Sequence, residues 1–439
     1  MGYDAVVVGA GLAGLSAGRD LAAGGADVVV LEARGRPGGR VEQTQLPDGR
    51  LVQLGGELTG PFQTAYHRLV EELGLSLESS FPSLPGEDTY VLADGRFVGD
   101  AYPWMSDEDR ASLTAVEEQF GKLVETVDPD DPWSHPDAER LDRLSVAAWM
   151  RDAGATRNAV RAEDVAALAL SSESIERISL LSELRKQAVA GVTGFYDYEV
   201  WEAQRVVEGS ATVALRMAAE LGHRVRYATP VRRIRVEGSG CVVTAVNGER
   251  FECAAVVSAL PVGPLRDLDI EGVSEERLSS LRRQRHAVAA KAVFVYGSSF
   301  WHEHGQSGTG YGEVGLIGGI WPQVDGIIST LVPPERLAPL IATPEHLVEE
   351  ELTEEMVVLF GEQAAHPDAF YVRRWGVDPW TQGYITAWRP GDVMAVGPLH
   401  GTHEPPFYVC GSDQWVCGYM EGAVRTGRGA AAAAVANGT

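Results

Sequence analysis

The first forty residues constrain the fold more than any other stretch of the chain. The apolar run "DAVVVGAG" ends in glycines, "LAGLSAGRDLAA" has helical composition as far as Gly24-Gly25, and "ADVVVLEA" is again apolar and β-branched. Continuous apolar runs of this kind are typical of parallel strands buried on both faces. The pattern therefore predicts a strand–helix–strand unit of about thirty residues, and with it a parallel α/β sheet.

The turn inside this unit has the spacing of a dinucleotide site, Gly9-x-Gly11-x-x-Gly14. The first glycine permits the tight turn, the second lets a pyrophosphate approach the backbone, and the third lets helix and strand pack closely. Glu32 closes the second strand, where a carboxylate accepts hydrogen bonds from both ribose hydroxyls. Because that carboxylate repels a 2′-phosphate, the sequence disfavours NADP but leaves NAD and FAD open.

The rest of the chain alternates between segments of different character. A stretch rich in Pro, Asp and Trp (81–137) is interpreted as acidic loop, and 141–190 has helical spacing of apolar residues. A β-rich stretch (223–260) with turns at Gly238–Gly240 and Asn247-Gly248 follows, and the last forty residues are expected to run strand, loop, helix.

This alternation predicts two domains that are interleaved in sequence. We expect a nucleotide-binding domain from residues 1–80, 201–268 and 383–439, and a substrate domain from 81–200 and 269–382.

The composition excludes several classes of protein. A formal net charge of −25 disfavours nucleic-acid binding, because a phosphate-binding surface needs a basic excess. No stretch reaches the roughly 18 apolar residues of a membrane span. The first strand begins at about Tyr3, which leaves no room for a signal peptide, so a cytoplasmic protein is expected. The four cysteines form no C-x-x-C pair and are expected to be reduced, and His302 and His304 lack the spacing of a helical metal pair, so no metal is expected.

Two further motifs indicate which dinucleotide binds. "RPGGR" ends at Arg40, and "LGGELTG" spans Leu54–Gly60. Together with the glycine turn they resemble the glutathione-reductase-like flavoproteins, and in particular the flavin-containing amine oxidases of the monoamine oxidase family. The resemblance implies FAD, bound by a Rossmann-like α/β domain interleaved with an α+β substrate domain whose mixed sheet is covered by helices.

Later segments are similar to the same family in order. "EGSATVALRMAAEL" resembles the turn and helix that open its second flavin-binding segment, and "ATPVRRIRV" resembles the strand that meets adenine at Val231. "VCGSDQWVCGYMEGAV" resembles the closing motif, in which Asp413 contacts ribityl or phosphate groups and the N–H of Met420 lies near flavin O2. The cofactor-binding residues that the resemblance implies are Gly9, Gly11, Gly14, Glu32, Ala33, Arg34, Gly39, Arg40, Gly55, Gly56, Glu57, Val231, Trp375, Gly411, Ser412, Asp413, Gly418 and Met420.

The resemblance also implies catalytic residues. Lys291, in "AAKAVFVYGSSFW", takes the place of the lysine that holds a water against flavin N5; the alternative is an edge lysine that reaches solvent. Tyr384 and Tyr419 take the place of two tyrosines that form walls in front of the flavin; the alternative is core packing. For Tyr384, a shift of one residue would put Ile385 there, and Trp375, Trp380 and Trp388 are further candidates to line the cavity.

The departures from the family are equally informative. Gly383 stands where monoamine oxidases with covalent flavin have a cysteine, so non-covalent FAD is expected. Glu57 lies where L-amino-acid oxidases have a carboxylate-binding arginine, which argues for an amine without a carboxylate. Polyamine oxidases often have an acidic residue where this chain has Thr59. The role of Glu57 stays open between a distant ammonium, the cofactor and a backbone N–H.

The expected reaction is oxidation of a primary or secondary amine to an imine and then an aldehyde, with O2 as acceptor and hydrogen peroxide as product. Two alternatives stay open: a desaturase or ring oxidase on the same scaffold, and a non-catalytic flavoprotein that binds a partner. The expected partners are a small-molecule amine and O2, and neither nucleic acid nor a membrane is expected. The oligomeric state stays open, with a homodimer as one alternative.

Overall fold

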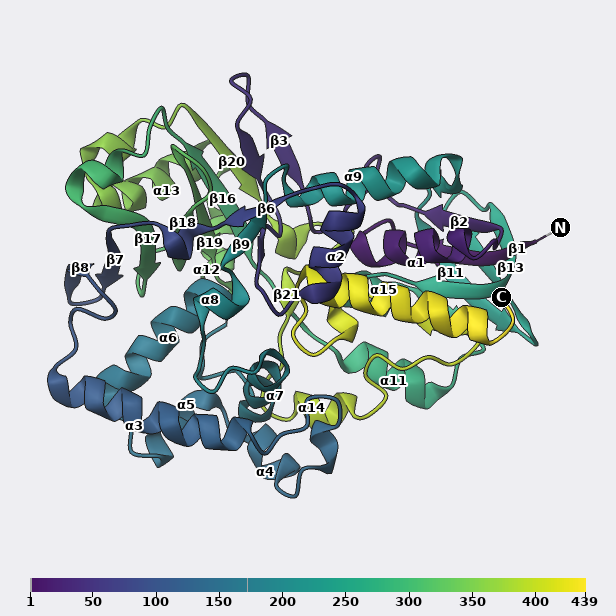
Figure 1. Cartoon of the computed structure of the whole chain (residues 1–439), viewed down its shortest axis with the longest axis horizontal. Helices are drawn as coiled ribbons and strands as arrows, with labels where there is room; N and C mark the ends of the chain where they lie inside the picture. The colour runs from purple at the N-terminus through teal and green to yellow at the C-terminus, as the bar shows by residue number, and fades with distance from the viewer. Residues whose placement is uncertain (1, 172) are drawn as a thin grey trace.

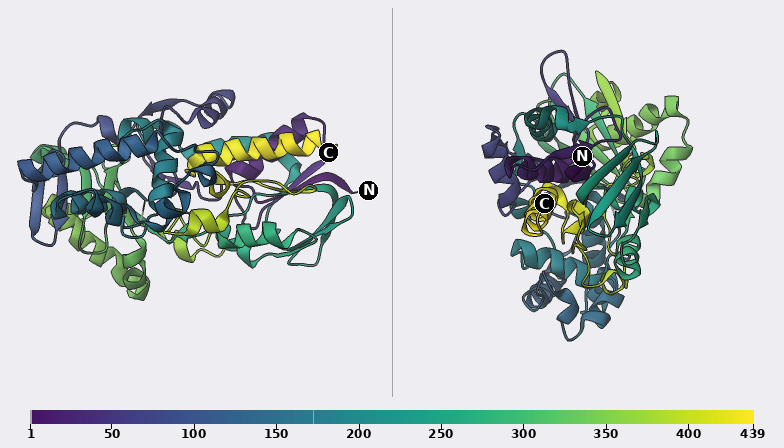
Figure 2. Two further views of the ribbon diagram at one scale, coloured as in Figure 1. Left: turned by 90° about the horizontal axis from the view of Figure 1, so that it is seen from below. Right: turned by 90° about the vertical axis from the view of Figure 1, so that its right-hand side faces the viewer.

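The structure is a computed structural model that describes residues 2–171 and 173–439. Its first strand–helix–strand unit confirms the prediction: β1 (Tyr3–Val8), α1 (Leu12–Ala23) and β2 (Val28–Leu31) follow one another. In Figure 1 the sheet that contains them lies to the right, a second sheet lies at the upper left, and helices α3 to α7 lie at the lower left. Both termini lie at the same end of the molecule, away from those helices (Figure 2).

The first sheet places the predicted dinucleotide turn at one edge. Its strand order is β10-β2-β1-β13-β12-β11-β14, with β22 paired to β13. β10, β2, β1, β13 and β22 are parallel, so their carboxyl ends meet at one edge. Within the predicted β-rich stretch, β11, β12 and β13 form an antiparallel meander. The bounds are β10 (Val225–Arg226), β11 (Val231–Glu237), β12 (Gly240–Ala245), β13 (Arg250–Ser258), β14 (Asp269–Glu271) and β22 (Phe407–Val409).

Alternation along β1 explains why this sheet is buried on both faces. Ala5 and Val7 pack into one core with α1, α9 (Ser210–Leu221) and α15 (Tyr419–Ala436). Val6 and Val8 point the other way, into a core that includes residues of α10 (Val262–Asp267) and α11 (Glu275–Arg283). Because successive side chains of a strand point to opposite faces, a continuous valine run serves both cores.

The second sheet is mixed, as the resemblance implied. Its strand order is β20-β16-β19-β18-β17-β7-β8, and only β17 and β7 run parallel. Its core includes residues of α12 (Pro334–Ala342) and α13 (Glu345–Phe360). The strand bounds are β7 (Glu87–Leu92), β8 (Gly95–Gly99), β16 (Ala290–Val295), β17 (Gln306–Gly312), β18 (Gly319–Pro322), β19 (Ile327–Val332) and β20 (Ala369–Arg373).

The interpretation of 81–137 as acidic loop is wrong for most of its length, because it contains β7, β8 and the 18-residue helix α3 (Asp107–Val124). Ser106 caps this helix by accepting a hydrogen bond from the Asp109 N–H at 3.1 Å, while the Asp109 carboxylate accepts from the Ser106 N–H at 3.2 Å. The acidic residues of "SDED" thus lie in the first turn, where the helix dipole favours negative charge.

Helix α3 packs with four helices of the predicted helical region around one core. These are α4 (Ala138–Arg143), α5 (Val146–Asp152), α6 (Arg157–Ser171) and α7 (Leu180–Ala190). Shorter elements connect the sheets and helices: β3 (Gln43–Gln45), β4 (Leu51–Gln53), β5 (Leu58–Thr59), α2 (Thr64–Glu72), β6 (Leu77–Ser79), α8 (Tyr198–Trp201), β9 (Gln204–Val206), β15 (His286–Ala287), β21 (Ile385–Thr386) and α14 (Asp392–Val396).

Within residues 2–171 and 173–439, no helix has both the length and the apolar character that crossing a bilayer requires. The domain bounds given above stay a prediction.

Candidate active site

The glycine turn lies at the carboxyl end of β1 and leaves open space for a ligand. A Cβ on Gly14 would lie 1.9 Å from the carbonyl oxygen of Gly9, so α1 can start this close to the strand only with glycine. Gly11, in contrast, lines a cavity, and a Cβ there would have no heavy atom within 4 Å. The first N–H groups of α1 have no acceptor within the helix. This combination of open backbone and free N–H groups fits a pyrophosphate.

Glu32 is held rigidly at the end of the neighbouring strand. Its Oε2 accepts a hydrogen bond from the Ala10 N–H at 2.8 Å and its Oε1 accepts from the Arg34 N–H at 2.9 Å. The side chain lines the same cavity as Gly11. A carboxylate oxygen accepts more than one hydrogen bond, so both oxygens keep capacity for ribose hydroxyls.

The "RPGGR" loop packs directly on the glycine turn, because the Gly38 N–H donates to the Ala10 carbonyl at 2.8 Å. Arg40, at the end of this loop, reaches the closing motif: its Nη1 donates to Asp413 Oδ1 at 2.8 Å and its Nη2 to Ser412 Oγ at 2.7 Å. Two motifs more than 370 residues apart therefore form one unit.

Asp413 is the centre of this unit. Its carboxylate also contacts His286 Nε2 at 2.8 Å and accepts from the Val262 N–H at 3.1 Å. Burial acts to raise the pKa of Asp413, but Arg40 and His286 hold it well below its ordinary value. Asp413 is thus an ionised side chain that positions Arg40.

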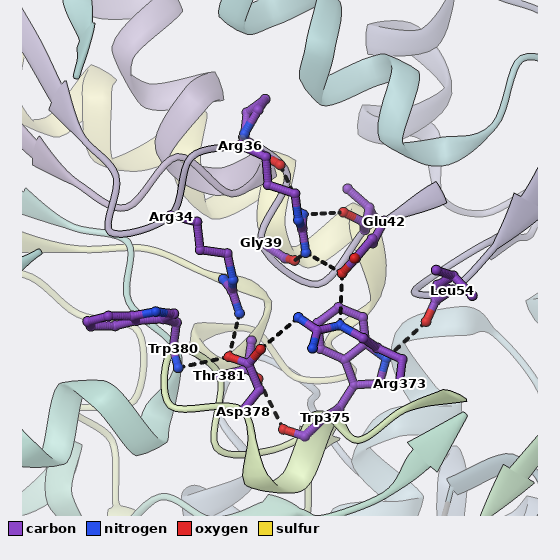
Figure 3. Close-up of polar contacts among 12 residues, drawn as sticks. Arg34, Arg36, Gly39, Glu42, Leu54, Arg373, Trp375, Asp378, Trp380 and Thr381 are labelled. Carbon is purple, nitrogen blue, oxygen red and sulfur yellow. Dashed lines mark hydrogen bonds and ion pairs between the residues drawn. The ribbon is translucent and has the colours of Figure 1, made fainter. Parts of the chain in front are cut away.

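A second ionic network joins residues 34–42 to residues 373–381 (Figure 3). Asp378 accepts from Arg34 Nη2 at 2.5 Å and from Arg373 Nη2 at 2.6 Å. Arg373 Nε donates to Glu42 at 2.9 Å, and Glu42 also pairs with Arg36. The network fixes the start of the chain that leads from β20 towards Tyr384.

Trp375 extends this connection into the cavity. Its indole N–H donates to the Leu54 carbonyl at 3.0 Å, and its own carbonyl accepts from Thr381 Oγ1 at 3.0 Å (Figure 3). Arg373 lies over its ring, 4.6 Å from the centroid. The predicted cavity residues Trp375, Trp380 and Trp388 all line the cavity.

One continuous cavity of about 530 Å³ extends from the glycine turn to a group of aromatic side chains. Almost every site residue predicted from the sequence lines it, within the part of the chain that the structure describes. The two exceptions are Gly14, which packs against the strand, and Lys291.

Lys291 lies behind the cavity wall. It is 1% exposed and stands on β16, between β19 and β20, so the alternative of an edge lysine that reaches solvent is wrong. Its ammonium donates to the Gly55 carbonyl at 3.1 Å and forms an ion pair with Glu57. Burial lowers the pKa of Lys291, and the charge of Glu57 acts against that shift.

Glu57 stands between Lys291 and the cavity. Its Oε1 accepts from the Trp321 indole N–H at 2.7 Å, while its Oε2 contacts Lys291. Both oxygens of this carboxylate are therefore bound to side chains. The expected alternative in which Glu57 binds a backbone N–H is therefore wrong, because its carboxylate contacts the side chains of Trp321 and Lys291.

Tyr419 begins α15 in an unusual backbone conformation, with φ of 56° after Gly418 with φ of 70°. A non-glycine residue in the left-handed region is strained and is common at functional sites. Its hydroxyl lies 3.0 Å from the Tyr196 hydroxyl and 3.3 Å from Glu202 Oε1, and burial raises its pKa well above the ordinary value. The free N–H groups at the start of α15, including Met420, lie at the same wall.

Tyr384 lines the same cavity from the chain before β21. Its N–H donates to the Ala287 carbonyl at 2.8 Å and its carbonyl accepts from Arg40 at 3.1 Å. Burial raises its pKa, and the charges of Glu202 and Glu57 add to the shift. Ile385 also lines the cavity, so the pairing of Tyr384 with Tyr419 stays a prediction.

The residues opposite these tyrosines were not predicted from the sequence. Glu202, Tyr196 and Tyr198 line the cavity, and the ring of Trp201 packs 5.3 Å from that of Tyr419. Lys186 lies 5.2 Å from the ring centroids of Tyr196 and Trp201. The only sequence signal was the aromatic-rich run "GFYDYEVWE" just before the second flavin-binding segment.

Comparison with known proteins agrees with this geometry. Residues 12–435 match the family described as flavin containing amine oxidoreductase. A putrescine oxidase from Kocuria rosea is 31% identical over 98% of this chain and 94% of its own, and an L-amino acid dehydrogenase from Synechocystis sp. is 28% identical over the same shares. A solved structure of wild-type putrescine oxidase bound to putrescine superposes with a TM-score of 0.89 at 26% identity, covering 99% of both chains.

Proposed function

Since the chain belongs to the flavin-containing amine oxidoreductase family, we propose that it oxidises a primary or secondary amine to an imine, with O2 as acceptor and hydrogen peroxide as product. The observation that carries this proposal is the single cavity in which the glycine turn and the tyrosines Tyr384 and Tyr419 meet. A cofactor held at the turn and a substrate held at the tyrosines share that space.

FAD fits the described residues as a non-covalent cofactor. Gly11 and the start of α1 would hold its pyrophosphate, Glu32 its ribose, and the start of α15 the pyrimidine end of the flavin. A Cβ on Gly383 would lie 2.2 Å from His286 Nδ1, which disfavours a cysteine linkage at that position. When bound, the flavin supplies the two-electron oxidation of the amine carbon and returns the electrons to O2.

The chain's own residues bind and orient the amine. The faces of Tyr384 and Tyr419 attract an alkylammonium by cation–π interaction, and the raised pKa of each hydroxyl keeps both rings neutral. The buried wall around them excludes water from the reacting carbon, and positioning of this kind accounts for much of the rate of such reactions.

An amine without a carboxylate is the substrate class we favour. Glu57 occupies the place of a carboxylate-binding arginine and already pairs with Lys291, and Glu202 adds a second carboxylate to the wall. Cavity walls of this sign attract cations rather than amino-acid carboxylates. One relative is named an oxidase and another a dehydrogenase, so the test must measure the electron acceptor separately from the substrate.

The test is to mix the flavin-loaded protein anaerobically with a panel of amines, amino acids and alcohols of matched carbon skeleton, and to follow the flavin absorbance. We expect bleaching by at least one amine and none by the matched alcohols. Admission of air should restore the absorbance and release one hydrogen peroxide per amine consumed. Bleaching by amino acids alone would overturn the proposed substrate class. Reoxidation only by an artificial acceptor would overturn O2 as the acceptor. Bleaching only by a compound that contains no amine would indicate a desaturase or ring oxidase.

A further inference from the structure

The amine oxidation proposed above leaves a proton unaccounted for. A simple alkylamine, like the lysine side chain with its ordinary pKa of about 10.4, is almost entirely protonated near neutral pH. Its nitrogen then has no lone pair, and oxidation at the neighbouring carbon requires the neutral amine. A group in the cavity that takes this proton would let the abundant ammonium form serve as the substrate.

Glu202 is positioned for this. It follows α8, is 9% exposed, and lines the cavity on the side of Tyr419. Its Oε1 accepts a hydrogen bond from the Tyr419 hydroxyl at 3.3 Å. Within residues 2–171 and 173–439 no cationic side chain forms a salt bridge with it.

The other glutamates of the cavity wall are already occupied. Glu32 accepts two backbone N–H groups at the ribose end. Each of the remaining three pairs with a cation: Glu57 with Lys291, Glu173 with Arg389, and Glu183 with Lys186. Glu202 is therefore the glutamate of this wall whose charge is free to meet an ammonium.

The groups that face Glu202 come from several elements. Lys186 of α7 lowers its pKa and Glu57 raises it, while burial has the largest effect, and the pKa of Glu202 is raised to about 7. Glu202 in turn acts on titratable groups across the cavity, namely Tyr196, Tyr198, Lys291, Tyr384 and Tyr419.

We propose that Glu202 binds the substrate ammonium beside Tyr419 and accepts its proton, so that a neutral amine faces the flavin. The N–H bond of the ammonium breaks, its electron pair stays on nitrogen as the lone pair, and an O–H bond forms on the carboxylate. An ammonium and a carboxylate become an amine and a carboxylic acid, so no net charge changes. Burial favours the neutral pair, because a low-dielectric site destabilises both ions.

The proton then has a path away from the substrate. The Tyr419 hydroxyl lies 3.0 Å from that of Tyr196, and Tyr196 also lines a second cavity, of about 670 Å³, outside the first. That second cavity is walled by Asp88, Glu117, Asp197 and Glu199. A chain of hydroxyl groups thus connects Glu202 to a space with carboxylates that can receive the proton.

The experiment compares wild type with Glu202→Gln in anaerobic flavin reduction over pH 6 to 10. For wild type we expect the second-order rate constant to rise with an apparent pKa near 7 and to fall again where the free amine loses its proton. In Glu202→Gln only free neutral amine reacts, so the limb near pH 7 disappears and the rate climbs up to the substrate's own pKa. At pH 8 the loss is about 250-fold for an alkylamine with a pKa of about 10.4, because only about 0.4% of it is neutral there.

A fluorinated analogue that is mostly neutral at pH 8 separates proton transfer from structural damage. With it, Glu202→Gln should reach within about threefold of wild type, because the missing proton acceptor is no longer needed. Glu202→Asp should restore part of the limb. The matched control is Glu118→Gln, which removes an exposed carboxylate of α3 that lines neither cavity and should keep the wild-type profile.

A binding measurement tests the same idea without turnover. tert-Butylamine carries no hydrogen on its α-carbon and cannot be oxidised; calorimetry at pH 8 should show its affinity about tenfold or more weaker in Glu202→Gln. An unchanged pH profile in Glu202→Gln, or equal losses with the ordinary and the fluorinated amine, would overturn the inference. Failure of wild type to be bleached by any amine would instead overturn the proposed function.

Discussion

Two alanine substitutions in the glycine turn should separate folding from cofactor binding. In Gly14→Ala the new Cβ would lie 1.9 Å from the Gly9 carbonyl oxygen and 3.1 Å from the Ala259 Cβ. The first distance is far inside van der Waals contact, so α1 must move away from β1, and overpacking of this kind costs about 1–3 kcal/mol or more. In Gly11→Ala the new Cβ meets nothing within 4 Å, and φ of −73° suits alanine, so the cost to the fold is below about 1 kcal/mol.

Gly11→Ala should weaken FAD binding strongly, although it has little effect on the fold. Its Cβ occupies the open space where the pyrophosphate would approach the backbone. Each charge-assisted hydrogen bond lost there is worth about 1.5–3 kcal/mol, which corresponds to an affinity about 10- to 100-fold weaker.

The assay is fluorescence titration of FAD into the apoprotein, together with thermal unfolding of each apoprotein. We expect Gly11→Ala to keep the wild-type apoprotein Tm and lose affinity, and Gly14→Ala to lose both. Wild-type affinity in Gly11→Ala would refute the placement of the pyrophosphate, and an equal loss of Tm in both variants would refute the packing argument.

Two further predictions concern the substrate end and the linkage position. The pKa of Glu202 is raised from 4.5 to about 7, so the folded state loses about 3 kcal/mol of stability as the pH rises from 4.5 to 7, and this loss is complete above pH 7. Glu202→Gln should therefore raise the Tm by about 3 °C at pH 8.5 and leave it unchanged at pH 4. Scanning calorimetry checks this, and an equal gain in Tm at both pH values would contradict it. Gly383→Cys should weaken flavin binding without attaching it, because its Cβ displaces His286 from Asp413; flavin retained by the acid-precipitated variant would contradict this.

The features that sequence predicted well are those set by local chemistry. The valine run, the helix after Gly11 and the strand that ends just before Glu32 depend on residues within one unit, and hydrophobic periodicity reports them directly. The same holds for the β-rich stretch with its turn at Asn247-Gly248, and for the strand, loop and helix at the end of the chain. These elements are also the ones that place the cofactor residues at one sheet edge.

The prediction for 81–137 failed because composition was given more weight than position. Acidic residues suggest solvated loop when they are counted, but "SDED" combines a cap with a negatively charged first turn, and the apolar residues Val116, Phe120 and Val124 follow at helical spacing. The capping signal was present in the sequence.

The substrate wall could not be predicted in the same way. Glu202 and Glu57 are the same residue type in the same cavity, yet one meets only hydroxyl groups and the other meets a lysine 234 positions later in the chain. Which of two glutamates is paired depends on contacts between distant segments, and no local pattern contains that information. The family resemblance predicted roles for Lys291 and Tyr419, but it assigned no charge partner to either of them.

The Lys291–Glu57 pair also determines how a lysine variant must be interpreted. Lys291→Met removes the cation and leaves Glu57 as an unpaired buried charge, and breaking a buried pair in this way costs about 3–5 kcal/mol. A loss of activity in Lys291→Met alone therefore does not separate a role in the reaction from damage to the wall.

In the double variant Lys291→Met/Glu57→Gln the carboxylate is gone as well, so we expect urea unfolding to show most of the lost stability restored. If anaerobic bleaching by the amine returns with stability while reoxidation by O2 stays slow, Lys291 acts on the oxygen step; if bleaching stays slow although stability returns, it acts on the amine step. A double variant no more stable than Lys291→Met would refute the reasoning, because the unpaired charge of Glu57 would then not be the source of the damage.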